Sequence, residues 1–184
     1  NWSLMAKEVF NAFENGYEGV IIAHGTDTMH YSASALSFAV ENPKGPVVFV
    51  GSQRSSDRPS SDAATNLLGA VIFAAKSNAS GVYVAMHASL NDDLIAIHKG
   101  VKVRKNHTSR RDAFESVNTE PLAFVDVKKH EIKLNEKKPD VKGPMKLYDK
   151  FSDRAALLKF YPGISERFLL ATFNKELFDS IIIE

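Results

Sequence analysis

The chain has 184 residues, of which 44% are hydrophobic, with a formal net charge of +1 and no cysteine. This apolar content suffices for one domain with a buried core, or for one domain and part of another. The balanced charge gives no global argument for a nucleic-acid or membrane partner, and disulfide and thiolate chemistry are excluded. No apolar run approaches the roughly 20 residues of a membrane span, and no signal peptide begins the chain, so we expect a cytoplasmic protein. Because the initiator methionine is absent, we also expect a piece of a longer protein.

Over the first 90 residues, amphipathic segments alternate with short apolar runs. Helices are predicted over 4–14, 28–40 and 62–76, and strands over 19–24, 47–50 and 81–86. This alternation is typical of parallel strands joined by right-handed crossovers, which predicts an α/β fold with a parallel, Rossmann-like sheet. From residue 93 the pattern changes to two β-hairpins. The first is predicted to turn near Lys99 and Gly100, and the second to join 122–127 to 131–134.

Residues 135–153 form the predicted domain boundary. They contain two prolines, one glycine and many charges, with no apolar periodicity, as is typical of a linker. After them come a predicted strand over 155–161, a helix over 165–178 and a strand over 181–183. We therefore expect an α/β domain over 1–134, a linker over 135–153 and the start of a smaller α/β domain over 154–184.

The segment His24-Gly25-Thr26-Asp27-Thr28 follows the strand at 19–23, which has no polar face. Thr26 and Asp27 thus place a hydroxyl and a carboxylate at the carboxyl end of a strand, where ligands bind in open α/β sheets. The alternative is that the pair only caps the helix that follows, by accepting hydrogen bonds from its free N–H groups.

Lys105 belongs to a basic segment, residues 99–111, which has no acidic residue. Strand alternation predicts that Val101 and Val103 share one face with Lys105, while Lys102 and Arg104 share the other. A lysine near a core must pair with a carboxylate or lose its proton, and both states are useful in catalysis. The alternative is a solvated edge strand, on which lysines prevent unwanted pairing.

Three segments together resemble one protein family. They are HGTDTMH at 24–30, GSQRSSDRPSSDAATNLLGA at 51–70 and VKVRKNHTSRRDAFES at 101–116. The first resembles the L-asparaginase/glutaminase family as a whole. The other two, especially QRSSDRPSSDAA and KVRKNHTSRRDAF, resemble its branch of asparaginase-like D subunits from archaeal glutamyl-tRNA(Gln) amidotransferases. The resemblance runs through nearly the whole chain and implies the asparaginase amino-terminal fold.

The resemblance implies a proton-transfer triad of Thr26, Asp27 and Lys105. In such a triad the lysine accepts the proton of the threonine hydroxyl, which then attacks or activates water. The family also implies that Asp27 receives the α-amino group of the substrate. Gly25 permits a close approach of the backbone, so Gly25, Thr26 and Asp27 are the expected substrate-binding residues, with an oxyanion contact nearby.

One departure from the family pattern matters. The primary nucleophile of the family is a threonine in a TGGTI-like segment on the first strand, and no such segment occurs in these 184 residues. We therefore expect this chain alone to be inactive. None of the six histidines has the spacing of a helical zinc site, and neither nucleotide-binding glycine motif is present, so no metal or cofactor is expected on this chain. Ser60, Ser61 and Asp62 are expected to cap the next helix, and the alternative is that they contact the site or a subunit interface.

The resemblance implies the glutaminase subunit of the enzyme that converts Glu-tRNA(Gln) to Gln-tRNA(Gln). Glutamine or asparagine would be hydrolysed through a threonyl acyl-enzyme, in a homodimer. Ammonia would pass to a kinase-transamidase partner, the E subunit, which uses ATP and magnesium and carries the glutamyl-tRNA. Two alternatives stay open: a free-standing cytosolic L-asparaginase, and a non-catalytic binding or dimerisation module. A contact of the 99–111 segment with tRNA phosphates also stays open.

Overall fold

The computed structural model describes residues 2–135, 137–139 and 143–184. The chain divides into two compact units, residues 1–149 and 150–184. None of the helices in the described ranges is long and apolar enough to cross a membrane.

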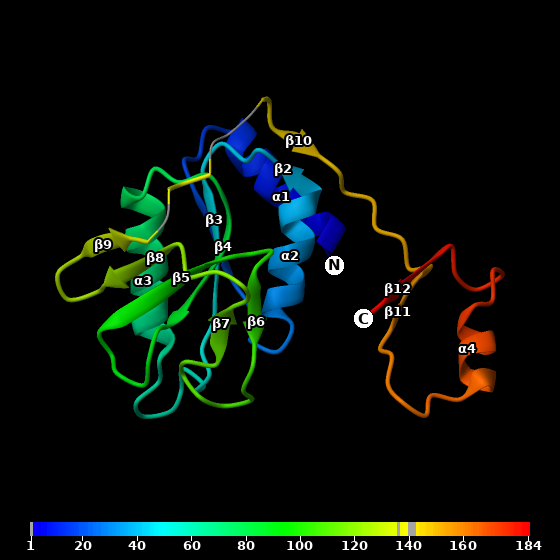
Figure 1. Ribbon diagram of the computed structural model, residues 1–184. Coiled ribbons are helices and arrows are strands. Elements are labelled where there is room, and N and C mark those ends of the chain that lie inside the picture. The colour runs from blue at the N-terminus through cyan, green and yellow to red at the C-terminus, as the bar shows by residue number, and fades with distance from the viewer. Residues whose placement is uncertain (1, 136, 140–142) are drawn as a thin grey trace. The chain divides into compact units, whose positions relative to one another are not determined.

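The first unit is built on a six-stranded mixed sheet (Figure 1). In sheet order its strands are β1 (Val20–Ala23), β3 (Pro46–Val50), β4 (Gly81–His87), β5 (Leu94–Lys99), β8 (Ala123–Asp126) and β9 (Glu131–Leu134). The pairs β1/β3 and β3/β4 are parallel, and the remaining pairs are antiparallel. The α/β prediction is therefore confirmed, and so is the hairpin of β8 and β9.

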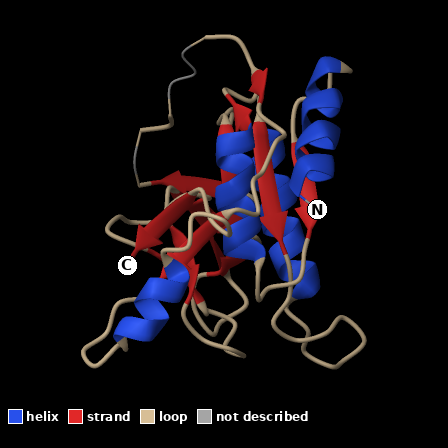
Figure 2. Ribbon diagram, turned by 90° about the vertical axis from the view of Figure 1, so that its right-hand side faces the viewer, coloured by secondary structure: helices blue, strands red, loops and turns tan. Residues whose placement is uncertain are grey.

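Helices cover both faces of this sheet, and Figure 2 shows them in blue against the red strands. α1 (Trp2–Glu14) and α2 (Met29–Ala39) pack on one face, where Phe13, Leu36 and Phe49 belong to the same buried cluster. α3 (Ala63–Lys76) packs on the other face in a second cluster with Phe73 and Tyr83. The alternation of side chains along each strand thus feeds two separate cores.

β1 is less buried than its sequence predicts. Its four residues are half-buried or exposed, whereas all five residues of β3 are buried. The reason is the position of β1 at the edge of the sheet, where β3 is its neighbour on one side only among the described strands. An apolar run marks a strand well but does not distinguish a central strand from an edge strand.

The predicted hairpin that turns near Lys99 and Gly100 is wrong. β5 pairs with β4 and β8, whereas β6 (Val103–Lys105) pairs with β7 (Phe114–Ser116) in a separate two-stranded sheet. Gly100 lies where the chain leaves the main sheet. A Cβ atom there would lie 2.8 Å from Ser37 Oγ and 3.1 Å from the Ala33 carbonyl oxygen, so the chain turns tightly against α2 before β6 begins.

Part of the segment predicted as a linker has regular structure. β10 (Lys146–Leu147) pairs antiparallel with β2 (Val40–Glu41), and Lys7 of α1 forms an ion pair with Asp149 at 2.9 Å. Residues 136 and 140–142 of the same segment lie outside the described residues.

The second unit is a single βαβ unit. β11 (Ala155–Leu158) and β12 (Ser180–Ile183) pair in parallel, and α4 (Glu166–Thr172) lies between them in sequence. Ser165 caps α4, because its side-chain oxygen accepts a hydrogen bond from the backbone N–H of Phe168 at 3.2 Å. The helix is shorter than the predicted range of 165–178, since it ends at Thr172.

Gly69 marks the closest approach of α3 to β5. A Cβ atom on Gly69 would lie 2.5 Å from Cγ1 and 2.8 Å from Cβ of Ile95, which is fully buried. Alanine favours a helix interior over glycine by about 1 kcal/mol. Overpacking a core costs about 1–3 kcal/mol, and a buried β-branched side chain has little freedom to move away.

We therefore expect Gly69→Ala to lower the free energy of unfolding, measured by urea denaturation. The matched control is the opposite exchange at exposed Ala75 of the same helix, where Ala75→Gly should destabilise by about 1 kcal/mol through helix propensity alone. A stabilised Gly69→Ala protein would show that α3 and β5 can separate without cost.

Candidate active site

The carboxyl ends of β1, β3 and β4 meet at one edge of the sheet, because the three strands are parallel. The backbone N–H of His24 donates to the Val50 carbonyl oxygen at 2.9 Å, so pairing continues one residue past β1. The segments that follow the three strands therefore lie side by side. In open α/β sheets this is the edge at which ligands bind.

Thr26 and Asp27 lie between β1 and α2, and they do not cap that helix. The N-cap position is Thr28, which makes no side-chain cap hydrogen bond in the described structure. The interpretation of Thr26 and Asp27 as a simple helix cap is therefore wrong. Their side chains are directed instead to a lysine that lies far away in sequence.

Lys105 joins the two side chains. Its Nζ atom donates hydrogen bonds to Thr26 Oγ1 at 2.8 Å and to Asp27 Oδ1 at 2.7 Å. The Lys105 side chain is only 7% exposed, whereas the Asp27 side chain is 92% exposed. The structure thus brings together the three residues that were predicted as a triad. The solvated-edge interpretation of Lys105 is wrong, because this side chain is buried and bonded to two oxygen atoms.

The face alternation that pointed to Lys105 holds in part. Val103 is buried and Arg104 is exposed, as predicted for β6. Val101 is 48% exposed and precedes the strand, so its predicted place on the buried face is wrong. The backbone N–H of Lys102 donates to the Lys99 carbonyl oxygen at 2.9 Å in a turn, which interrupts the alternation.

The positive charge of Lys105 controls the electrostatics at this edge. Its hydrogen bond to Asp27, and then its charge, lower the pKa of that carboxyl group. Asp27 is therefore a carboxylate at neutral pH and open to solvent. The pKa of His30, at the start of α2, is also lowered, first by burial and then by the charges of Arg104 and Lys105. His30 is therefore neutral at pH 7.

Gly51, at the end of β3, is the glycine that packs tightly against this site. A Cβ atom on Gly51 would lie 2.5 Å from the His24 carbonyl oxygen, 2.7 Å from Met29 Cε and 3.2 Å from Thr26 Cγ2. A Cβ atom on Gly25 would meet no described atom within 4 Å, so open space surrounds Gly25. Gly51 was not predicted as a site residue from the sequence. The available signal was a glycine that directly follows a buried strand beside the Thr26 segment.

Asp62 does not cap α3 with its side chain, contrary to the prediction. It is fully buried, and its carboxylate accepts hydrogen bonds from the backbone N–H groups of Gln53 at 3.0 Å and Arg54 at 2.9 Å. Asn66 Nδ2 donates a third hydrogen bond at 3.0 Å. Asp62 therefore fixes the loop that follows β3, and this role requires a tertiary contact that sequence spacing does not reveal.

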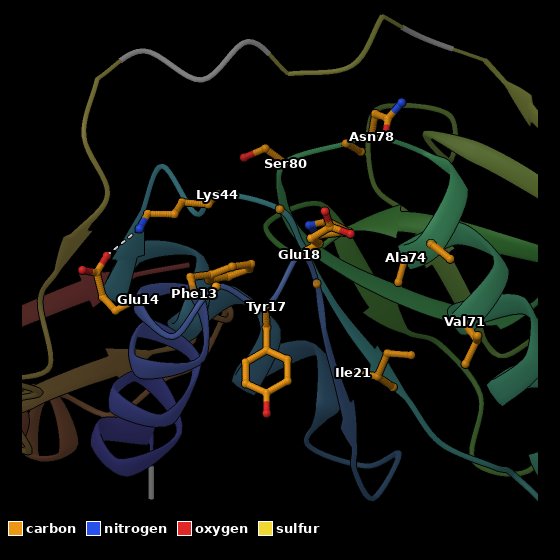
Figure 3. Close-up of a pocket in the computed structure, with 16 residues that line it drawn as sticks. Phe13, Glu14, Tyr17, Glu18, Ile21, Lys44, Val71, Ala74, Asn78 and Ser80 are labelled. Atoms are coloured by element: carbon orange, nitrogen blue, oxygen red, sulfur yellow. Dashed lines mark hydrogen bonds and ion pairs between the residues drawn. The ribbon is translucent and has the colours of Figure 1, made fainter.

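A cavity of about 830 Å³ lies at the other end of the strands (Figure 3). Its lining includes Tyr17, Glu18, Pro46 and Val71, which surround the beginnings of β1 and β3 and one side of α3. Thr26 and Lys105 are not among its lining residues. Because functional groups gather at the carboxyl ends of parallel strands, we assign the candidate active site to the opposite edge.

No group of three or more histidine, cysteine, aspartate or glutamate residues in the described part of the chain has an arrangement suited to a metal ion. The chemistry that this edge offers through its own side chains is that of a hydroxyl, a carboxylate and a buried amine. These three groups can exchange a proton, because hydrogen bonds already connect them.

Comparison with known proteins places this geometry in a family. Residues 1–140 match the model of the asparaginase amino-terminal domain. The chain is 51% identical over 183 residues to the D subunit of the glutamyl-tRNA(Gln) amidotransferase of Saccharolobus solfataricus, and the match covers 99% of this chain and 41% of that protein. The corresponding D subunit of Thermofilum pendens is 49% identical over 160 residues, or 85% of this chain and 36% of that protein. The chain thus spans about two fifths of the length of these relatives.

Solved structures agree with this result. The thermostable L-asparaginase from Thermococcus kodakarensis matches with a TM-score of 0.87 and 34% identity, over 100% of this chain and 52% of that one. L-asparaginase I from Vibrio cholerae matches with a TM-score of 0.84 and 30% identity, over 99% and 52% respectively. With its sheet order, its amino-terminal domain match and its relatives in accord, the chain belongs to the asparaginase family.

Proposed function

We propose that this chain is part of the glutaminase subunit of a tRNA-dependent amidotransferase, which converts Glu-tRNA(Gln) to Gln-tRNA(Gln). The observation that supports amide hydrolysis as the chemistry of this chain is the pair of hydrogen bonds from Lys105 to Thr26 and Asp27. The choice of enzyme is supported by relatives named as D subunits, which are about half identical to this chain over most of its length. Three matching L-asparaginases of known structure share 27–34% sequence identity with this chain.

In the proposed mechanism Thr26, Asp27 and Lys105 move one proton. Once the ammonium group of Lys105 has given a proton to solvent, its amine takes the hydroxyl proton of Thr26, and the oxygen of Thr26 in turn draws a proton from water. The resulting hydroxide attacks the carbonyl carbon of a threonyl ester, whose formation from the amide substrate released ammonia. The ester C–O bond breaks, Lys105 returns its proton to the leaving threonine oxygen, and the acid and the free threonine hydroxyl are released. The Asp27 carboxylate stabilises the ammonium group that forms on Lys105, and it also receives the α-amino group of the substrate together with Gly25 and Thr26.

We propose that the threonine of this ester belongs to another segment of the parent protein. In the described sheet, β1 is an edge strand, and its carboxyl end leads directly to Thr26. A further strand beside β1 would bring its own carboxyl end next to Thr26. The half-buried side chains of Val20, Ile21 and Ile22 support such a neighbour, since apolar side chains at a sheet edge invite pairing.

The proposal extends to the partners of the parent protein. Ammonia would pass to a kinase-transamidase partner, the E subunit, which would bind ATP, magnesium and glutamyl-tRNA, and two copies of the parent protein would form a homodimer. We further propose that residues 1–134 and 154–184 belong to its amino- and carboxy-terminal α/β domains, joined by 135–153. The second candidate is a free-standing L-asparaginase, favoured by the likeness to the Thermococcus kodakarensis structure.

The triad is tested in the parent protein by substitution. We expect Thr26→Val and Lys105→Met each to lower kcat for ammonia release by roughly two to four powers of ten, the usual contribution of general acid–base help. The matched control is Lys102→Met, because Lys102 is an exposed lysine outside the site. Equal and small effects of the two lysine substitutions would contradict the assignment. The chain of 184 residues alone should release no ammonia above background, since it lacks the acyl-forming threonine.

The choice between the two enzymes is tested by coupling. A glutaminase that serves a transamidase should have low activity on its own. Its partner and glutamyl-tRNA should raise this activity, because they bind the active state more tightly than the inactive state. We expect the parent protein alone to release ammonia slowly, and faster release with formation of Gln-tRNA once the partner, glutamyl-tRNA and ATP are added. Rapid hydrolysis of asparagine by the protein alone, with no response to tRNA or partner, would favour the L-asparaginase.

A further inference from the structure

Two buried polar residues lie beneath the candidate active site and contact each other. Asn66 of α3 and His87, the last residue of β4, are both fully buried. The Oδ1 atom of Asn66 lies 2.5 Å from Nδ1 of His87. Buried polar groups are costly unless all of their hydrogen bonds are made, so the contacts of this pair define a connected network.

The Asn66 side of the network reaches Thr26. Asn66 Nδ2 donates to the Gly51 carbonyl oxygen at 2.9 Å and to the buried carboxylate of Asp62 at 3.0 Å. Gly51 in turn packs so closely against His24 and Thr26 that it leaves no room for a Cβ atom. Asn66 therefore fixes the backbone at Gly51, which packs against Thr26.

The His87 side of the network reaches the hairpin that carries Lys105. His87 Nε2 lies 2.9 Å from Oδ1 of Asp92, and the same oxygen accepts a hydrogen bond from Arg111 NH1 at 2.9 Å. Arg111 NH2 also donates to the Ser60 carbonyl oxygen. Arg111 lies in the loop between β6 and β7, and Lys105 is the last residue of β6, directly before that loop. The loop is thus bound to β4 through Asp92.

The hydrogen bonds also define the orientation of the His87 ring. Asn66 directs its amide nitrogen to Gly51 and Asp62, so its oxygen can only accept, and His87 Nδ1 must donate. The hydrogen bond from His87, together with the charges of Arg111 and His87, lowers the pKa of Asp92, so this carboxylate also accepts. His87 is thus fixed between the amide oxygen of Asn66 and the carboxylate of Asp92.

We infer that Asn66 and His87 form a positioning pair, which holds Thr26 through Gly51 and Lys105 through Asp92 and Arg111 at the distance that proton transfer requires. The inference rests on the proposed function. It explains why a long, flexible lysine side chain keeps two hydrogen bonds from the end of a short strand. A displacement of about 1 Å in such a site lowers the rate by roughly a hundredfold, so anchoring the hairpin has a catalytic consequence.

Two neighbouring arginines of the same loop test this inference in the parent protein. Arg111→Ala cuts the hairpin from Asp92 and Ser60. The control is Arg110→Ala, because Arg110 forms an exposed double hydrogen bond to Asp112 within the loop and takes no part in the network. Its carbonyl oxygen, which accepts from Gln53 Nε2 at 2.7 Å, is retained in that variant.

We expect Arg111→Ala to lower kcat for ammonia release about tenfold, with KM within about twofold of wild type. The pH profile of kcat/KM should move as well, because Lys105 no longer meets both oxygens in the same geometry. Arg111→Lys should recover part of kcat, since an ammonium group can still donate to Asp92. Thermal unfolding should change little, because Arg111 lies in a loop and its ion pair with Asp92 is partly open to solvent. Arg110→Ala should leave kcat and the pH profile unchanged.

A second variant distinguishes a shared network from two separate effects. Asp92→Asn preserves the shape of an exposed side chain and weakens its bonds to His87 and Arg111. We expect its loss of kcat not to multiply with that of Arg111→Ala, since both substitutions break one chain of contacts. Multiplying losses, a wild-type Arg111→Ala enzyme, or an equal loss in Arg110→Ala would each overturn the inference. If Lys105→Met is inactive while Arg111→Ala is normal, the inference alone fails; a fully active Lys105→Met enzyme removes the proposed function and the inference with it.

Discussion

The buried amine of Lys105 is the constraint around which the carboxyl edge of the sheet is organised. Removing an ammonium group from water costs several kcal/mol unless hydrogen bonds and an opposite charge replace the lost solvent. Thr26 and Asp27 supply both, from a segment 79 and 78 residues away. The β6 hairpin therefore depends on the β1 segment, because without Thr26 and Asp27 it would bury the Lys105 ammonium group with neither of these partners.

Asp27 and Lys105 differ strongly in exposure, so the site has a solvent-facing side and a buried side. The Asp27 side chain is almost fully open to solvent, while Lys105 is nearly closed off. A carboxylate at the surface, with its pKa lowered from beneath, can meet a positively charged group from the solvent side. The lysine contacts Thr26 as its second partner, behind this carboxylate. A substrate would thus find charge recognition at the rim and proton transfer behind it.

Local sequence pattern predicted those parts of the fold that depend on neighbours in the chain. The helices α1 to α3, the three parallel strands and the β8/β9 hairpin follow from apolar periodicity and turn residues. The predicted β5/β6 hairpin failed because Gly100 sends the chain out of the sheet and against α2, which is a tertiary contact. Periodicity likewise misplaced Val101, since a turn interrupts the alternation on which that prediction rested.

The same distinction applies to the site: Thr26, Asp27 and Lys105 could be named from their motifs, yet only the fold shows that the lysine reaches both oxygens. Asp62, Asn66 and His87 carried no signal of their own, because an aspartate before a helix and a lone histidine in a strand are ordinary features.

Elements on both faces of the sheet contribute residues to the surroundings of the site. The β6/β7 hairpin packs on the core of α1 and α2 through Val103 and Phe114, whereas Asn66 extends from α3 on the other face of the sheet. His87, at the end of β4, is a residue through which polar contacts pass between these layers. The mixed sheet separates the two cores, so polar contacts between its two faces pass around a strand end. At the carboxyl ends of the strands, ligand access is thus combined with contacts from both faces of the sheet that hold Thr26 and Lys105 in place.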